Sequence, residues 1–173
     1  MKIEKLRPAL KWLIFALLLL VCYILQTTPG LFEVFHTKPV LIVSLAVCVS
    51  MYEGVMSSAF FCMTAGLLWD ISSDKLFGFN GVILLFYGLI VALLCIYYLH
   101  TKVLNALVFC VGLLLIQGVL DYGFYYAIWN LDSSWIILVQ HILPTAAYTV
   151  LVTPLLFYLV RFVERKLNEN ARI

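Results

Sequence analysis

Residues 53–81 read EGVMSSAFFCMTAGLLWDISSDKLFGFNG, and the rest of the chain is arranged around this stretch. Small residues recur in it at every fourth position, and the same spacing then reaches Asp70. Residues four apart lie on neighbouring turns along one side of a helix. Small residues on that side let another helix approach closely, as helices do inside a bilayer. The pattern predicts a helix-packing or partner-contact surface, here called the small-residue ridge: Gly54, Ser58, Cys62 and Gly66.

The composition around this stretch is that of a membrane protein. Of the 173 residues, 65% are hydrophobic and only 12% are charged, with a mean hydropathy of +1.08. A soluble domain carries about 25% charged residues. We therefore expect an all-α, polytopic membrane protein forming a single integral membrane domain over residues 1–173. The five cysteines lie singly in apolar segments, which is typical of buried free thiols.

The apolar segments predict a bundle of six transmembrane helices. A helix of about 20 residues crosses the hydrocarbon layer, and two of the segments are shorter than that. They could form one long helix through Glu53, or a helix hairpin that turns there. A charge in mid-bilayer costs several kcal/mol, which favours the hairpin. The expected spans cover approximately residues 9–28, 40–52, 54–70, 82–99, 103–129 and 135–163.

The positions of the basic residues predict the orientation of the bundle. Six spans place both termini on one side of the membrane, together with the turns at Glu53 and at residues 100–102. That side receives nine of the eleven lysines and arginines. Basic residues accumulate on the cytoplasmic side of plasma-membrane proteins. We therefore expect both termini to lie in the cytoplasm.

Three acidic residues are candidates for a structural or functional role, since ionisable groups are expensive to keep in lipid. Glu53 is either a polar turn residue at the interface or a contact for a partner helix or an internal cation. Asp70 either caps the loop that follows it, because aspartate often organises turns through backbone amides, or is a binding residue on the outer face of the membrane. Asp121 lies deepest within a predicted span.

Asp121 belongs to a predicted polar stripe. Gln117 and Tyr125 lie one turn on either side of it, so the three share one helix face. Gln140 and His141 of the sixth span are plausible interior partners of this stripe. The set is either a structural hydrogen-bond network or part of a path for protons or solutes.

Enzyme motifs are absent from the sequence. It contains no nucleophile elbow, no zinc-protease helix motif and no phosphate-binding loop. We expect no catalytic, cofactor-binding or metal-ligating residue, and therefore no enzymatic activity. The short basic ends are typical of topology signals and anionic-lipid contacts, not of a nucleic-acid site.

The same central stretch carries a resemblance to a known family. The acidic residue and glycine Glu53-Gly54 precede the small-residue helix, and residues 65–70 read AGLLWD. A loop with Gly78 follows, and then an apolar helix containing YGL at residues 87–89. In these features, in length and in its basic N-terminus, the chain resembles the bacterial rod shape-determining membrane proteins of the MreD family.

The resemblance implies a non-enzymatic scaffold of the cell-wall elongation machinery, located in the bacterial plasma (inner) membrane. Such a protein would bind an MreC-like membrane protein and so help to couple MreB filaments to peptidoglycan synthesis by RodA and its transpeptidase. The family is also similar in fold to the substrate-binding components of energy-coupling-factor vitamin transporters. A vitamin-binding membrane component, with a ligand site near the 70–81 loop and Asp121, is the alternative function.

Overall fold

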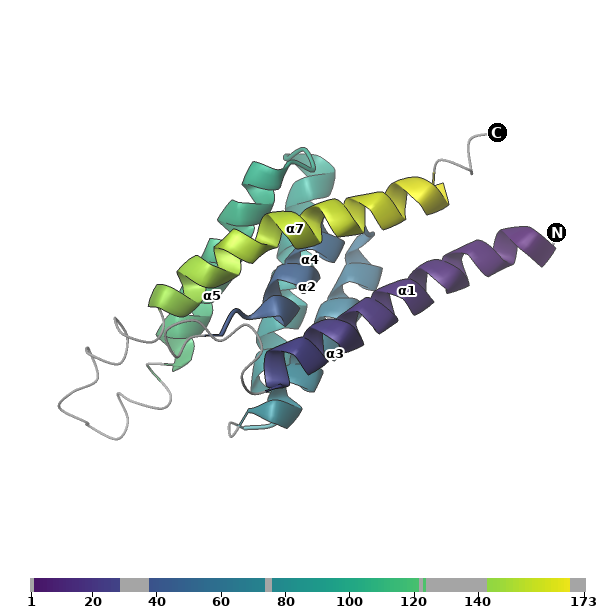
Figure 1. Ribbon diagram of the computed structural model, residues 1–173. Helices are drawn as coiled ribbons and strands as arrows, with labels where there is room; N and C mark the ends of the chain where they lie inside the picture. Colours follow the sequence, from purple (N-terminus) through teal and green to yellow (C-terminus); the bar gives the residue numbers. More distant parts are fainter. Residues whose placement is uncertain (1, 29–37, 74–75, 122, 124–142, 169–173) are drawn as a thin grey trace.

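A computed structural model describes residues 2–28, 38–73, 76–121, 123 and 143–168 (Figure 1). This part of the chain is all-α, as the sequence predicted, and contains six helices without a strand. The helices are α1 (Lys2–Thr27), α2 (Leu41–Ser50), α3 (Val55–Ser72), α4 (Phe79–Tyr97), α5 (Val103–Asp121) and α7 (Leu143–Asn168).

Helix α2 lies at the centre of the bundle. All ten of its residues are buried, and it packs against α1, α3, α4, α5 and α7. Its sequence, LIVSLAVCVS, is apolar on every side, and a helix of that kind is stable only where other helices surround it. The other five helices therefore form a shell around α2, and α1 and α7 run to the same end of the molecule as the two termini (Figure 1).

The number of long spans differs from the prediction. Within the described residues, five helices (α1, α3, α4, α5 and α7) are long and apolar enough to cross a membrane, whereas the prediction was six spans. At 1.5 Å per residue, α2 covers only roughly 15 Å, about half of the hydrocarbon thickness. Sequence hydropathy counted the apolar residues of α2 but could not show that it ends at Ser50.

The hairpin around Glu53 is present. α2 and α3 are separate helices that pack against each other, and Glu53 lies in the turn between them. Several ends differ from the expected spans: α1 begins at Lys2, α3 continues to Ser72, and α7 continues to Asn168. The predicted end of the fifth span and start of the sixth lie outside the described residues.

The outer helices present large apolar side chains on their outward faces. Each long helix has at least one that is more than half exposed: Leu13, Phe60, Phe86, Leu104 and Leu155. In water such a surface would cause aggregation, whereas in a bilayer it is the surface that meets lipid tails. A set of polar side chains is buried between the helices instead, among them Asp70, Asn80, Gln117 and Glu164, and these define the sites described next.

Candidate functional site

The small-residue ridge of α3 faces α4. The Ser58 hydroxyl donates a hydrogen bond to the Gly88 carbonyl oxygen at 3.2 Å. A Cβ atom added at Gly88 would collide with the Cys62 side chain. At Gly66, an added Cβ would lie 2.6 Å from the Asn80 carbonyl oxygen and 2.6 Å from the Gly81 Cα. The two backbones therefore approach to a distance that only glycine permits.

Gly54 has a different setting from the other three ridge residues. It precedes the first turn of α3 in an extended conformation, and no atom would lie within 4 Å of an added Cβ. The close contact with α4 thus runs from Ser58 to Gly66. Since α4 itself covers this side of α3, the ridge is occupied within the protein.

Asp70 holds the first turn of α4. Its side chain is 3% exposed. Its Oδ2 accepts hydrogen bonds from the backbone N–H groups of Gly78 at 2.9 Å and Gly81 at 3.2 Å. Its Oδ1 accepts from the Asn80 backbone N–H at 3.2 Å and from Asn80 Nδ2 at 2.8 Å. A carboxylate suits this position, because the N-terminal N–H groups of a helix have no partner within the helix and carry partial positive charge.

Gly78 gives the chain the backbone conformation that this cap requires. It has a φ of 92°, in the left-handed region that favours glycine. The turn reverses the chain between α3 and α4 and aims the N–H groups of residues 78, 80 and 81 at Asp70. Asp70, the last residue of the AGLLWD segment, thus organises the loop that follows.

Asn80 extends the cap to a third helix. It is fully buried, and its Oδ1 accepts a 2.8 Å hydrogen bond from Gln117 Nε2 of α5. Asp70, Asn80 and Gln117 therefore form a continuous hydrogen-bonded chain across α3, α4 and α5, here called the polar relay. The sequence analysis singled out Asp70 and Gln117 but missed Asn80. The N-terminal position of Asn80 in a helix that follows Gly78 is the signal that could have identified it.

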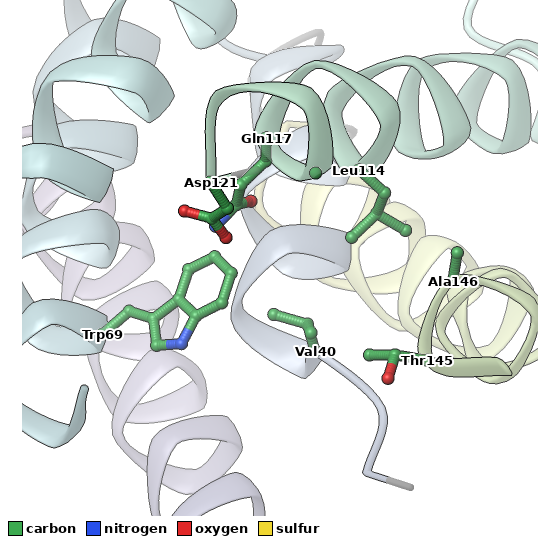
Figure 2. A pocket seen from close by; sticks show the side chains of 8 residues that line it. Val40, Trp69, Leu114, Gln117, Asp121, Thr145 and Ala146 are labelled. Carbon is green, nitrogen blue, oxygen red and sulfur yellow. The ribbon is translucent and has the colours of Figure 1, made fainter. Parts of the chain in front are cut away.

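Gln117 and Asp121 line one cavity, as Figure 2 shows. The cavity has a volume of about 180 Å³ and lies between α3, α5 and α7 next to the start of α2. The Trp69 indole forms its opposite wall, beneath the two polar side chains in the view of Figure 2. Tyr125, Gln140 and His141, the other members of the predicted polar stripe and its partners, lie outside the described residues.

Glu53 belongs to a buried group of charges at the other end of the bundle. Lys11 of α1 forms ion pairs with Glu53 at 2.5 Å and with Glu164 of α7 at 2.6 Å. The side chains of Lys11, Glu53 and Glu164, here called the charge triad, are 14%, 11% and 6% exposed. Lys11 is thus the cation that lies next to Glu53 in the structure.

Sequence reasoning did not find the charge triad as a set. It placed Lys11 among the topology signals and left Glu164 unassigned. The predicted orientation was the signal that could have identified it. Six crossings place the Glu53 turn at the same end of the bundle as both termini, and therefore near Lys11 and Glu164. Glu164 is also the acidic residue set among Arg161, Arg165 and Lys166.

A second polar group holds α2 against its neighbours. The Val40 N–H donates to Thr149 Oγ1 at 2.9 Å, and the Ile42 N–H donates to Gln26 Oε1 at 3.3 Å. Further along, the hydroxyl groups of Ser44 and Thr153 are 3.0 Å apart. These contacts satisfy the start of a buried helix, whose N–H groups would otherwise be orphaned in an apolar interior.

The chemistry of these sites is that of hydrogen bonding and charge pairing. In the part of the chain that the structure describes, no three His, Cys, Asp or Glu residues are grouped so as to hold a metal ion. Glu53 and Asp70 lie in two separate networks, one with Lys11 and Glu164 and one with Gly78, Asn80 and Gly81. The two acids are therefore not a catalytic pair.

Comparison with known proteins now adds to this geometry. The family model of the rod shape-determining protein MreD matches residues 6–167, which is nearly the whole chain. No curated protein and no solved structure matches the chain. The matched region contains every residue of the charge triad and of the polar relay. The chain therefore belongs to the MreD family of rod shape-determining membrane proteins.

Proposed function

We propose that this protein is a membrane scaffold of the rod-shape machinery that binds an MreC-like protein through its lipid-facing surface. Membership of the MreD family implies a role in rod shape determination and a non-enzymatic, multi-pass membrane protein. In the scaffold function that we propose, binding to this partner links MreB filaments to peptidoglycan synthesis by RodA and its transpeptidase.

The observation that supports a scaffold most directly is the division between inner and outer surfaces. The Ser58-to-Gly66 part of the ridge is covered by α4, and the charge triad and polar relay join helices of the same chain. Partner binding then falls to the outward faces, where large apolar side chains are exposed. A single-span partner could pack on such a face by side-chain packing alone.

Both termini are proposed to lie in the cytoplasm, where the filaments assemble. The head, the 100–102 turn and the tail together hold nine of the eleven basic residues, which favours the cytoplasmic side. The charge triad supports the even number of crossings that this requires. It joins the turn after α2 to the first half of α1 and the last turns of α7.

The alternative function, a vitamin-binding transporter component, gains no support from the 70–81 loop. Asp70 was the candidate ligand-binding acid of that loop. Each of its carboxylate oxygens accepts two hydrogen bonds from the start of α4. This carboxylate is therefore engaged in holding two helices together.

The scaffold proposal is tested by photo-crosslinking in the membrane of rod-shaped bacteria that depend on this protein. A photoreactive amino acid replaces one exposed residue on each outward face in turn: Leu13, Phe60, Phe86, Leu104 and Leu155. We expect one face to crosslink to the MreC-like protein in cells that remain rod-shaped. The matched control is the same substitution at buried Leu45, which is fully enclosed.

A negative result would be equally clear. If every outward position yields crosslinks to lipid or to unrelated proteins while the cells stay rod-shaped, direct MreC binding by these helices is wrong. If the protein restores rod shape in a strain that lacks the MreC-like protein, the scaffold function is wrong in its choice of partner.

A further inference from the structure

The last turns of α7 carry a groove on their outward side. It has a volume of about 280 Å³ and is lined by Tyr158, Arg161, Phe162 and Arg165. These residues are spaced three and four apart, so they share one face of the helix. The groove is near the end of α7 at which both termini of the chain lie (Figure 1). A cavity of about 150 Å³ holds a molecule the size of benzene, so the groove has room for a phosphate group and the carbon atoms esterified to it.

The two arginines of the groove are not paired within the part of the chain that the structure describes. Arg165 is exposed and Arg161 is half-buried. Neither guanidinium forms an ion pair or a side-chain hydrogen bond with a described residue. Glu164, which lies next to Arg165 in the sequence, is buried on the inner side of the helix, where it pairs with Lys11. The groove therefore presents two positive charges to its surroundings.

The spacing of these charges suits a phosphate group. The Cβ atoms of residues four apart on a helix are about 5–6 Å apart, so the side chains of Arg161 and Arg165 can converge on one anion. A guanidinium matches the oxygen atoms of a phosphate through two parallel hydrogen bonds. Lys166 brings a third positive charge beside the groove, since its ammonium group lies 4.9 Å from the centre of the Phe162 ring.

The same face of α7 becomes apolar toward the middle of the membrane. Tyr158 and Phe162 are each 59% exposed. Leu155 and Leu151 continue the face away from the arginines and are 64% and 76% exposed. Tyrosine is typical of the depth of the lipid headgroups, and leucine of the depth of the acyl chains. Along α7 the face thus offers, in order, partners for the phosphate, the ester groups and the acyl chains of a phospholipid.

We propose that this groove is a binding site for one phospholipid of net negative charge. The lipid phosphate accepts hydrogen bonds from Arg161 and Arg165. The Tyr158 hydroxyl donates to an ester carbonyl oxygen, and the acyl chains lie along Leu155 and Leu151. A zwitterionic lipid binds less well, because its own cationic group would lie among the same positive charges. The basic tail was expected to contact anionic lipids in general, whereas the groove assigns one bound lipid to two arginines.

The site is tested on the purified protein without partner proteins, so the result is independent of the proposed MreC binding. The protein is placed in phosphatidylcholine nanodiscs that contain a small fraction of phosphatidylglycerol with a photoreactive acyl chain, and crosslinked peptides are identified by mass spectrometry. Crosslinks around Leu151 and Leu155 are compared with those at Met56 and Phe60, which are exposed on α3. The same ratio is measured with photoreactive phosphatidylcholine.

Phosphatidylglycerol should give the higher ratio, by roughly 25-fold, because each basic residue at the membrane surface favours an anionic lipid by roughly fivefold. Arg165→Gln, at an exposed position, should reduce this preference to roughly fivefold, and Arg161→Gln/Arg165→Gln should abolish it. The matched control is Lys102→Gln, which removes one exposed charge outside the groove and should leave the preference unchanged.

Three results would each overturn the proposal. The first is equal ratios for the two lipids. The second is an equal loss of preference in Lys102→Gln and Arg165→Gln, which would show attraction by net charge alone. The third is loss of the preference in sodium phosphate but not in sodium chloride of the same ionic strength, which would identify a site for free phosphate in place of a lipid.

Discussion

Substitution of Asp70 by asparagine tests whether this carboxylate holds α3 and α4 together. Each carboxylate oxygen accepts two hydrogen bonds, one pair from Asn80 and the other from the N–H groups of Gly78 and Gly81. Asp70→Asn keeps the shape of the side chain but exchanges one oxygen for an NH₂ group. Two of the four donors then face another donor.

The expected loss follows from these hydrogen bonds. Hydrogen bonds to a charged group are worth about 1.5–3 kcal/mol each, so losing two lowers the free energy of unfolding by about 3–6 kcal/mol. The smaller cost of burying a neutral amide offsets part of this, which makes the lower figure the safer expectation. For a chain of this length, 1 kcal/mol shifts the melting temperature by about 2–4 °C. Asp70→Asn should therefore lower the Tm by about 6 °C or more.

The assay is thermal unfolding of the purified protein in one detergent, followed by the fraction that remains monodisperse. Ser73→Ala is the matched control, because it removes one neutral hydrogen bond, the 3.2 Å bond from the Ser73 hydroxyl to the backbone oxygen of Asp70. It should cost about 1 kcal/mol or less. A double-mutant cycle with Asn80→Ala should give a coupling energy of about 0.5–3 kcal/mol. A Tm for Asp70→Asn within about 2 °C of the wild-type value would refute the capping role.

Three further substitutions have expected outcomes in the same assay. Gly66→Ala should lower the free energy of unfolding by about 1–3 kcal/mol, since its Cβ would meet the α4 backbone, whereas Gly54→Ala, with open space around it, should leave the Tm within about 2 °C; equal losses would disprove the close packing. Gly78→Ala should cost about 1–2 kcal/mol, because its φ of 92° is strained for any other residue; an unchanged Tm would contradict that. Lys11→Met should cost about 3–5 kcal/mol by leaving Glu53 and Glu164 without their shared cation, and adding Glu53→Gln should recover part of the loss; if the double variant is no more stable than the single one, the triad does not act as a unit.

Features that depend on periodic spacing were accessible from the sequence. The all-α class, the turn at Glu53 and the position of Asp70 near the end of its helix all follow from hydropathy and from residues four apart. The same spacing identified Gln117 and Asp121 as neighbours on α5, and both line one cavity. In each case the information is local, within one helix or one turn.

Features that depend on contacts between distant segments were not accessible. Asn80 appeared to be a loop residue, because nothing near it in the sequence indicates that Asp70 and Gln117 lie on either side of it. Glu164 meets Lys11 across nearly the full length of the chain. The sequence showed that the 40–52 segment is shorter than a typical span, but not that the other helices would enclose α2 on every side.

The short α2 helix explains why three charges are buried between α1, α7 and the 53 turn. Buried polar contacts occur at two depths of the bundle, here called its two polar levels. Gln26 and Thr149, which bond to the start of α2, lie at one of them. The other is marked by Lys11 and Glu164, which meet the turn after α2. On α1 and on α7 the two levels are 15 residues apart, or roughly 22 Å along the helix axis.

This spacing is less than the hydrocarbon thickness of about 30 Å. A turn at that level must either lie below the membrane surface or sit in a locally thinned bilayer. In both cases Glu53 lies within the depth of the membrane, where an isolated charge costs several kcal/mol. A neighbouring cation lowers that cost. Lys11 and Glu164 surround it on α1 and α7. The charge triad is thus the physical consequence of placing a ten-residue helix at the centre of a membrane bundle.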